Sequence, residues 1–276
     1  MTESAAASLV DLPFAYAVGV TDAQEDLLLE GAVEAVHPLA SVSKPITALG
    51  VLTAVAQGFL ELDEPAGPEG STVRHLLAHA AGFAFDEERE LSAPGRRRMY
   101  SNAGFAVLGR HLELATGFEV GEWLELQVAQ PLGLRDVELE GSPGAGFHGS
   151  VRDLLCIGRE LLSPRLLPRS LWQEALTVQF PGLSGLLPGY GRQDPNDWGL
   201  GLEIRGHKSP HWTGSRNSPR TVGHFGQSGS FLWVDPEAGI AAAFLGEEPF
   251  GPPHVAAWPR LSDALLERCA TDGATK

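Results

Sequence analysis

The sequence predicts an α/β fold in which a sheet flanked by helices is joined to a mostly helical lobe. Strand-like segments lie near both ends of the chain, and the residues between them have mostly helical periodicity. Strands that are distant in sequence bury their apolar faces most economically when they join a single sheet. We therefore expect residues 1–60 and 196–276 to form one discontinuous α/β lobe and residues 61–195 to form the helical lobe, with a ligand cleft between them.

Apolar patterning places the strands and the first long helix. The apolar and aromatic segment 13–20 is expected to pair with segment 26–32 as a hairpin. A helix is expected to begin near Ser41 and to end near Gly58, because apolar residues recur between them at intervals of three or four. Later strands are expected at residues 200–205, 221–225, 230–234 and 240–245.

Capping residues and helix breakers divide the middle of the chain. Thr72 is placed to cap a helix over residues 73–81, and Ser150 to cap one over residues 151–162. Glycine and proline crowd residues 181–195, which indicates a long loop. Further helices are expected at residues 103–115, 119–129, 170–177 and 256–270, the last of them broken at Pro259.

Composition and charge exclude several classes of function. The chain carries 20 Lys and Arg against 35 Asp and Glu, and its net charge of −15 repels phosphates and anionic lipids. We therefore expect neither nucleic acid nor a membrane as a partner. Residues 1–20 lack the Lys or Arg of a secretory leader, and Cys156 and Cys269 form no CxxC pair. A cytoplasmic location is the resulting expectation.

The first candidate motif is Ser41-Val42-Ser43-Lys44, at the start of the first long helix. A serine and a lysine three residues apart on a helix face the same way, so Ser41 can attack a carbonyl while the Lys44 amine takes its proton. Free N–H groups at a helix start can hold the oxyanion. Pro45 removes a helical hydrogen bond, so the first turn should be loose or tight. Alone the motif is weak, because serine is a common helix cap.

The second candidate motif is Tyr100-Ser101-Asn102, just before a predicted helix. A tyrosine close to a cationic lysine can have a depressed pKa and shuttle protons. The Asn102 amide can bind a substrate carbonyl and orient the lysine. The simpler interpretation is that Asn102 is only the N-cap of the following helix.

The third candidate motif is His224-Phe225-Gly226-Gln227, at the end of a predicted strand. Gly226 would let a substrate backbone lie against the strand edge, and the Gln227 N–H would be a second oxyanion donor. His224 would supply a partial positive charge near neutral pH. The simpler interpretation is an ordinary histidine at a strand end.

The order of the three motifs is typical of serine penicillin-recognising enzymes, which have SxxK, then a second motif, then a short strand motif ending in glycine. The chain resembles the class C β-lactamase-related serine hydrolases, a family that includes D-alanyl-D-alanine carboxypeptidases and family VIII esterases. The resemblance covers nearly the whole chain. The matching segments are residues 40–52 (ASVSKPITALGVL), 72–82 (TVRHLLAHAAG), 100–109 (YSNAGFAVLG), 131–137 (PLGLRDV), 150–155 (SVRDLL) and 223–239.

This resemblance implies a β-lactamase/transpeptidase-like fold, with an antiparallel sheet flanked by helices, and an acyl-serine mechanism in the cleft between the lobes. Ser41 would be the nucleophile, Lys44 the group that activates it and Tyr100 a proton relay. Whether the lysine or the tyrosine is the formal base stays open. Contacts to the substrate and the oxyanion would come from Asn102, His224, Gly226 and Gln227, together with the Ser41 N–H.

The third motif departs from the family pattern, because it reads HFG where β-lactamases usually have KTG. A histidine supplies only part of the permanent cation that a lysine gives to a substrate carboxylate. The departure favours small esters or amides over penicillins. We expect a serine hydrolase of esterase, peptidase or weak β-lactamase type, acting on a small molecule. The alternative is a non-catalytic ligand-binding or sensor module that keeps the fold.

Other chemistries have little support in the sequence. No GxSxG nucleophile elbow occurs. HExxH is also absent and the histidines are scattered, so no metal is expected, and no cofactor is expected either. His79 is interpreted as a structural histidine between helices. Arginines at residues 96–98 are either a solvated cluster or a lip that attracts anionic substrates. Core packing and cleft lining remain equal alternatives for Trp198, Trp212 and Trp233.

Overall fold

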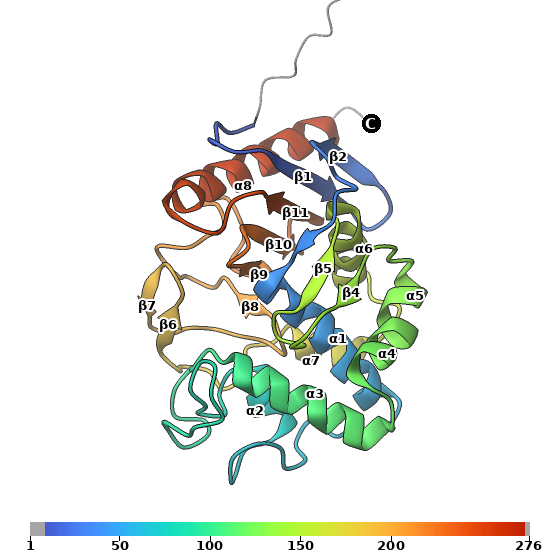
Figure 1. Ribbon diagram of the computed structural model, residues 1–276. Coiled ribbons are helices and arrows are strands. Elements are labelled where there is room, and N and C mark those ends of the chain that lie inside the picture. The colour runs from blue at the N-terminus through green and yellow to red at the C-terminus, as the bar shows by residue number, and fades with distance from the viewer. Residues whose placement is uncertain (1–8, 274–276) are drawn as a thin grey trace, which may run out of the picture.

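A six-stranded antiparallel sheet lies at the centre of the computed structural model, which describes residues 9–273 (Figure 1). The strand order is β2-β1-β11-β10-β9-β8, so strands from both ends of the chain lie side by side. This confirms the expected single sheet. The strands are β1 (Tyr16–Thr21), β2 (Asp26–Glu30), β8 (Glu203–Ile204), β9 (Val222–Gly226), β10 (Ser230–Asp235) and β11 (Ile240–Gly246).

The central strands are buried on both faces. β10 and β11 are therefore nearly continuous apolar runs rather than alternating ones. The turn between them is held by Asp235, whose carboxylate accepts hydrogen bonds from the N–H groups of Glu237 at 3.1 Å and Ala238 at 3.2 Å. β1 pairs with β11 from Tyr16 opposite Gly246 onward and with β2 on its other side, so the first strand lies inside the sheet, next to its edge.

Helices cover the two faces of the sheet. α8 (Pro252–Gly273) buries an apolar stripe against one face. The other face is covered by α6 (Val151–Leu162), with α1 (Ser43–Ala56) beside it. The close approach of α6 depends on Gly158, because a Cβ at this position would lie 2.7 Å from the Ala241 Cβ.

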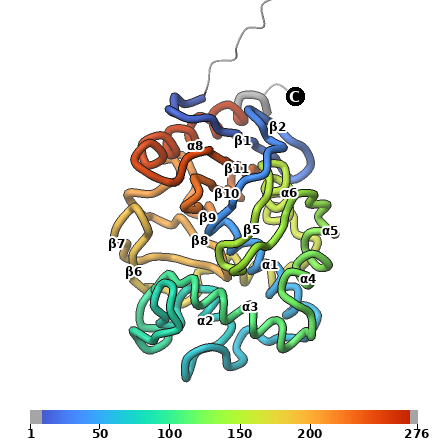
Figure 2. Tube along the Cα trace, in the orientation of Figure 1, coloured from blue at the N-terminus to red at the C-terminus, as the bar shows by residue number. Residues whose placement is uncertain are grey.

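The remaining elements lie around and beyond α1. The trace in Figure 2 leaves the sheet after β2, reaches α2 and α3 at the opposite end of the molecule, and returns at β8 and β9. These elements are β3 (His37–Pro38), η1 (Ala40–Val42), α2 (Val73–Leu77), α3 (Asn102–Thr116), α4 (Val120–Leu124), the π-helical turn η2 (Glu125–Ala129), α5 (Gln130–Leu132), β4 (Glu138–Leu139), β5 (Phe147–Gly149), α7 (Arg169–Ala175), β6 (Gly185–Leu187) and β7 (Gly191–Gln193).

Two expected helix boundaries are wrong. The helix expected over residues 73–81 is capped by Thr72 as predicted but ends at Leu77, since His79 has a φ of 53° that no helix accommodates. α8 continues through Pro259, where a break was expected. The burial of its apolar stripe outweighs the roughly 3 kcal/mol that an internal proline costs. Among residues 9–273, no helix is both long and apolar enough to span a bilayer.

The position of α6 differs from the one expected for it in the division into two lobes. α6 packs on the sheet, although its residues were assigned to the helical lobe. Ser150 caps α6 as expected, and Asp153 completes a reciprocal capping box by accepting the Ser150 N–H at 3.0 Å. The lobe boundaries near residues 60 and 195 stay a prediction.

Candidate active site

Ser41 lies in a strained turn between β3 and α1. The turn η1 is a 3₁₀ helix, so of the two expected alternatives, a loose or a tight first turn, the structure has the tight one. Ala40, the residue before the serine, has a φ of 46°, a conformation that typically costs about 1–3 kcal/mol for a residue other than glycine. The Ser230 Oγ donates to the Leu39 carbonyl at 2.8 Å and ties this turn to β10. The surrounding structure therefore holds the serine in place.

Gly226 allows β9 to pass directly against this turn. A Cβ at position 226 would lie 2.4 Å from the Leu39 carbonyl oxygen and 2.4 Å from the Ser230 Oγ. The missing side chain thus makes room for the turn that carries Ser41. Gly226 thus serves the packing of the protein itself, and the expected contact between Gly226 and a substrate backbone stays a prediction.

Lys44 is fully buried one helical turn after Ser41. Its Nζ lies 3.5 Å from the Ser41 Oγ and donates to the Asn102 Oδ1 at 2.6 Å and to the Gly144 carbonyl at 2.8 Å. Burial lowers the pKa of the amine to about 7, although the charge of Asp86 opposes this shift. A neutral amine has two N–H groups, which these two acceptors use, and its lone pair is left for Ser41.

Tyr100 contacts Ser41 from the other side. Its hydroxyl donates to the Ser41 Oγ at 2.7 Å, and its ring centroid lies 4.7 Å from the Lys44 Nζ. Burial raises the pKa of this phenol well above its ordinary value. The expected depressed pKa is therefore wrong. The phenol stays protonated at neutral pH and acts as a hydrogen-bond donor.

Asn102 bridges Lys44 to the loop before α3. Its Oδ1 accepts from Lys44, and its Nδ2 donates to the Asp86 carboxylate at 2.8 Å, which fixes the orientation of the amide. The N-cap of α3 is Ser101, whose side chain accepts the Gly104 N–H at 3.0 Å. The interpretation of Asn102 as a simple helix cap is thereby excluded.

His224 lines the same small cavity as Ser41 and Tyr100. Its Nδ1 pairs with the Phe225 carbonyl at 2.7 Å, and burial lowers its pKa to about 3. The ring is therefore neutral, and the expected partial positive charge is wrong. With the proton on Nδ1, the Nε2 is an acceptor, and it has no hydrogen-bond partner among residues 9–273. This nitrogen suits an N–H or O–H of a ligand, not a carboxylate.

Two backbone N–H groups beside this cavity are free. Within the described part of the chain, neither the Ser41 N–H nor the Gln227 N–H has a hydrogen-bond acceptor. Both residues line the cavity, whose volume is about 30 Å³. Unpaired donors at such a position can hold an oxyanion that develops on a carbonyl at Ser41.

A family comparison agrees with this arrangement. The model of the Beta-lactamase family matches residues 14–266. The chain belongs to the β-lactamase family. Among proteins related in sequence, it is similar to Esterase EstB of Burkholderia gladioli, with 37% identity over 145 residues that cover 36% of this chain and 37% of that protein. A relative from Salmonella newport (strain SL254), provisionally named a D-alanyl-D-alanine carboxypeptidase, is 26% identical over 208 residues.

The chain matches much less of these curated relatives than of its structural neighbours. The match to the Salmonella protein covers 58% of this chain and 47% of that one. By contrast, a solved structure named as a beta-lactamase from Mycobacterium bovis is 48% identical, has a TM-score of 0.92 and covers 93% of this chain and 96% of its own. EstCE1, named a hydrolase with promiscuous acyltransferase activity, has a TM-score of 0.75 at 18% identity and shows the fold alone. The expected β-lactamase/transpeptidase-like fold is confirmed.

Two groups in the site of this β-lactamase family member have no signal in the sequence. The Gly144 carbonyl that orients Lys44 belongs to a loop, and a main-chain acceptor leaves no residue pattern. Glu203 is a buried carboxylate at the cavity wall, held by Lys208 at 2.9 Å, His211 at 3.0 Å and Trp212 at 2.7 Å. Its partners hold the pKa of Glu203 far below the ordinary value against the cost of burial.

Some of the aromatic residues near the site line the small cavity, and others pack in the hydrophobic core. Trp198 lines the small cavity, whereas Trp212 and Trp233 are buried in the core beneath α8. His79 is buried with its ring 4.5 Å from that of Tyr100, and its Nδ1 accepts the Ser101 N–H at 3.2 Å. The β-lactamase family member therefore uses His79 to position the segment that carries Tyr100, as a structural histidine would.

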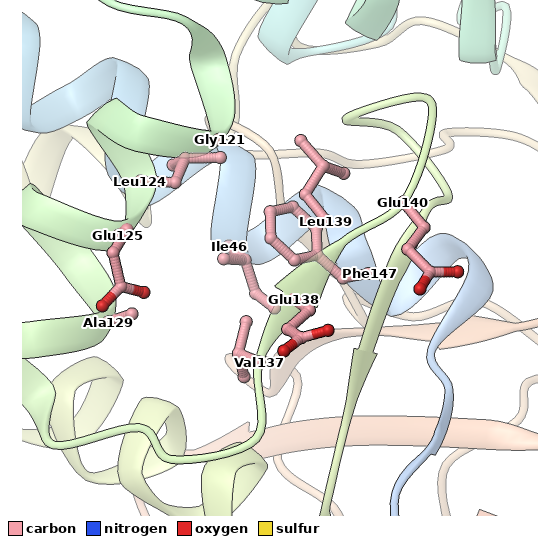
Figure 3. Close-up of a pocket in the computed structure, with 10 residues that line it drawn as sticks. All are labelled: Ile46, Gly121, Leu124, Glu125, Ala129, Val137, Glu138, Leu139, Glu140 and Phe147. Atoms are coloured by element: carbon pink, nitrogen blue, oxygen red, sulfur yellow. The ribbon is translucent and has the colours of Figure 1, made fainter.

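A second cavity, of about 330 Å³, lies between η2 and the strands β4 and β5. Figure 3 shows Ile46 and Phe147 on its apolar wall, with the carboxylates of Glu125, Glu138 and Glu140 around it. None of the candidate catalytic residues of this β-lactamase family member lines it. It is therefore separate from the candidate active site.

Proposed function

We propose that this protein is a serine hydrolase that forms an acyl-enzyme at Ser41 on a small ester or amide. One observation carries the proposal: the Ser41 Oγ lies between the Tyr100 hydroxyl at 2.7 Å and the Lys44 amine at 3.5 Å, and that amine has a pKa of about 7. A base whose pKa lies near the working pH transfers protons efficiently. The esterase and beta-lactamase names of related proteins support the same class of chemistry.

The proposed reaction gives Ser41, Lys44 and Tyr100 distinct roles. The neutral Lys44 accepts the Ser41 proton while the Oγ–carbon bond forms, and the N–H groups of Ser41 and Gln227 hold the oxyanion. Collapse breaks the bond to the leaving group, which takes the Tyr100 proton, and the Lys44 ammonium returns a proton to Tyr100. Water then attacks the acyl-enzyme with Lys44 as base again, and Ser41 departs with the proton.

The neutral His224 separates this proposal from efficient penicillin hydrolysis. A buried histidine with a pKa of about 3 offers a substrate carboxylate no positive charge at that position. Its free Nε2 instead accepts a hydrogen bond. We infer that β-lactams are at most poor substrates and that small esters or amides are hydrolysed faster.

Active-site labelling tests the proposal without a known substrate. We expect a fluorophosphonate to form one covalent adduct, located on Ser41 by peptide mapping, and expect Ser41→Ala to lose both the adduct and the hydrolysis of short-chain 4-nitrophenyl esters. Ser228→Ala is the matched control, because Ser228 lies in the hairpin after β9 and its side chain pairs, among residues 9–273, only with Ser230 at 3.0 Å. Tight reversible binding, with no adduct on Ser41 and equal turnover by Ser41→Ala, would show a non-catalytic binding module instead.

The charge of Asp86 should set part of the pH dependence. Because the neutral amine is the base, kcat/KM should rise with pH through about 7, the pKa of Lys44. Asp86 favours the ammonium form, so Asp86→Asn should lower that pKa and move the rising limb to lower pH, by less than about one unit for an exposed charge. Glu87→Gln, a change at an exposed neighbour paired with Arg89, should leave the limb in place. A limb that does not move in Asp86→Asn contradicts the assignment of Lys44 as base.

A further inference from the structure

A larger cavity opens directly beside the candidate catalytic one. Its volume is about 670 Å³, against about 30 Å³ for the cavity at Ser41, and the two share Phe85, Tyr100 and Pro188 as lining residues. The small cavity holds little more than the reacting carbonyl. The remainder of a substrate must extend elsewhere, and the shared wall leads it into the larger cavity.

Arginines dominate the charge of this larger cavity. Arg96, Arg97, Arg98 and Arg192 line it, and none of its described lining residues is an Asp or Glu. Arg96 and Arg97 are exposed and form no ion pair or side-chain hydrogen bond within residues 9–273. Arg192 donates to the Ser184 Oγ at 3.1 Å and makes a long contact of 3.4 Å with the Asp194 carboxylate, so the unpaired charge is mainly that of Arg96 and Arg97. In a chain with a net charge of −15, this is an unusual concentration of uncompensated positive charge.

Arg98 fixes the wall that carries its two neighbours. Its guanidinium is buried and donates to the carbonyls of Ala78 at 2.6 Å, Asn196 at 3.0 Å, Gln179 at 2.6 Å and Phe180 at 3.2 Å. These carbonyls satisfy its donors without neutralising its charge. Burial lowers its pKa only to about 10, so it stays cationic at neutral pH. The wall is therefore rigid and positively charged before any ligand arrives.

Apolar side chains lie beside these charges. Phe85 is 50% exposed and Leu186 is 68% exposed, and both line the cavity together with Phe83 and Pro188. The Arg98 N–H donates to the Ser184 carbonyl at 3.0 Å, which joins the arginine segment to the strand pair β6–β7. A ligand that fits this surface has an apolar segment with an anionic end.

We propose that the substrate carries a carboxylate, separated from the scissile carbonyl by a short apolar segment, and that Arg96 and Arg97 bind this carboxylate. The proposal rests on the proposed function, because it assigns a substrate class to the site at Ser41. The positive charge that the third motif lacks is supplied by the arginines of the adjoining larger cavity. Arginine suits this role because its planar fork binds a carboxylate through two hydrogen bonds.

Two pairs of matched esters test the proposal and locate the carboxylate. The acyl pair is the 4-nitrophenyl esters of glutarate and of its neutral monoamide, glutaramate. The leaving-group pair is the butyrate esters of 3-(4-hydroxyphenyl)propanoate and of the corresponding propanamide. For one pair, kcat/KM of the charged ester should exceed that of the neutral ester by about tenfold, as expected of a carboxylate bound by two arginines. Raising the salt concentration should bring this ratio towards one.

Charge-matched variants separate the cavity from the general field of the protein. The ratio of kcat/KM for the charged ester to kcat/KM for the neutral ester should fall towards one in Arg96→Gln/Arg97→Gln. It should stay unchanged in Arg169→Gln/Arg260→Gln, which removes the same charge from α7 and α8. A ratio near one in the wild-type protein for both pairs, or a ratio that the first variant leaves unchanged, overturns the proposal.

A binding experiment keeps the two proposals distinguishable. In Ser41→Ala protein, 3-phenylpropanoate should bind about tenfold more tightly than 3-phenylpropanamide by isothermal titration calorimetry, and this preference should disappear when Arg96→Gln/Arg97→Gln is added. Equal affinities overturn the proposal that the larger cavity binds a carboxylate, even if esters are hydrolysed. A clear preference together with no turnover and no adduct in the wild-type protein overturns only the proposed function.

Discussion

Replacing Lys44 by methionine is expected to lower kcat/KM for a short-chain ester by about 10³-fold, which is typical for the loss of a positioned general base. Methionine keeps the length of the buried side chain, but its thioether is not basic and cannot take the Ser41 proton. The rising limb near pH 7 should disappear with the amine. Steady-state kinetics between pH 5.5 and 9 measure both effects, and a variant that keeps its limb would assign the base to another group.

The same substitution should change stability in a way that depends on pH. The folded protein releases the Lys44 proton at about pH 7, whereas the unfolded chain keeps it up to about 10.5. The energetic penalty of burying this amine is therefore complete below pH 7 and vanishes as pH rises through 10.5. The free energy of unfolding of Lys44→Met relative to wild type should thus fall between these values, by up to about 1.4 kcal/mol per pH unit.

Urea titrations at pH 6.5 and 9.5 measure this difference, because the pH effects of other groups cancel between variant and wild type. Arg169→Gln, at an exposed position on α7, serves as control and should show no pH-dependent difference. A difference for Lys44→Met that stays constant across this range would mean that the amine is not neutral in the folded protein.

Replacing Tyr100 by phenylalanine is expected to lower kcat by about 10²-fold or more, with a smaller change in KM. The substitution removes the hydroxyl that donates to the Ser41 Oγ at 2.7 Å and the acid that protonates the leaving group. The limb near pH 7 should remain, because Lys44 is unchanged. Loss of this limb in Tyr100→Phe would identify the tyrosine as the base. Activity equal to wild type would exclude Tyr100 from the mechanism.

Tyr190→Phe is the matched control for this experiment. Tyr190 is also buried near the third motif, with its ring 5.9 Å from that of Phe225, but its hydroxyl has no hydrogen-bond partner among residues 9–273. Removing that hydroxyl should leave kcat and KM close to the wild-type values. The comparison separates the role of one phenol from the general effect of deleting a buried oxygen.

Local patterns predicted much of this molecule correctly. The strands β9, β10 and β11 are apolar runs bounded by turn residues, and Ser150 caps α6 because capping depends on a few neighbouring residues. The motif of Ser41 and Lys44 also rests on local geometry, since three residues on a helix are one turn. These features need little knowledge of the rest of the fold.

The electrostatic state of the site was not predictable in the same way. Burial shifts the pKa of Tyr100 upward and that of His224 downward, and burial results from packing between distant segments. The depressed tyrosine pKa and the partly charged histidine were inferred from residue type alone. Glu203 was missed because its partners Lys208 and Trp212, although only five and nine residues away, follow no recognisable motif.

The pairing of β1 with β11 has a consequence for synthesis of the protein. β1 is flanked by β2 on one side and by β11 on the other, and residues 240–246 leave the ribosome long after the segment that contains Ser41. The nascent chain therefore cannot complete its sheet until residue 246 has emerged, and such long-range pairing slows folding. A ribosome-bound chain truncated before residue 240 should consequently be inactive and a target for chaperones.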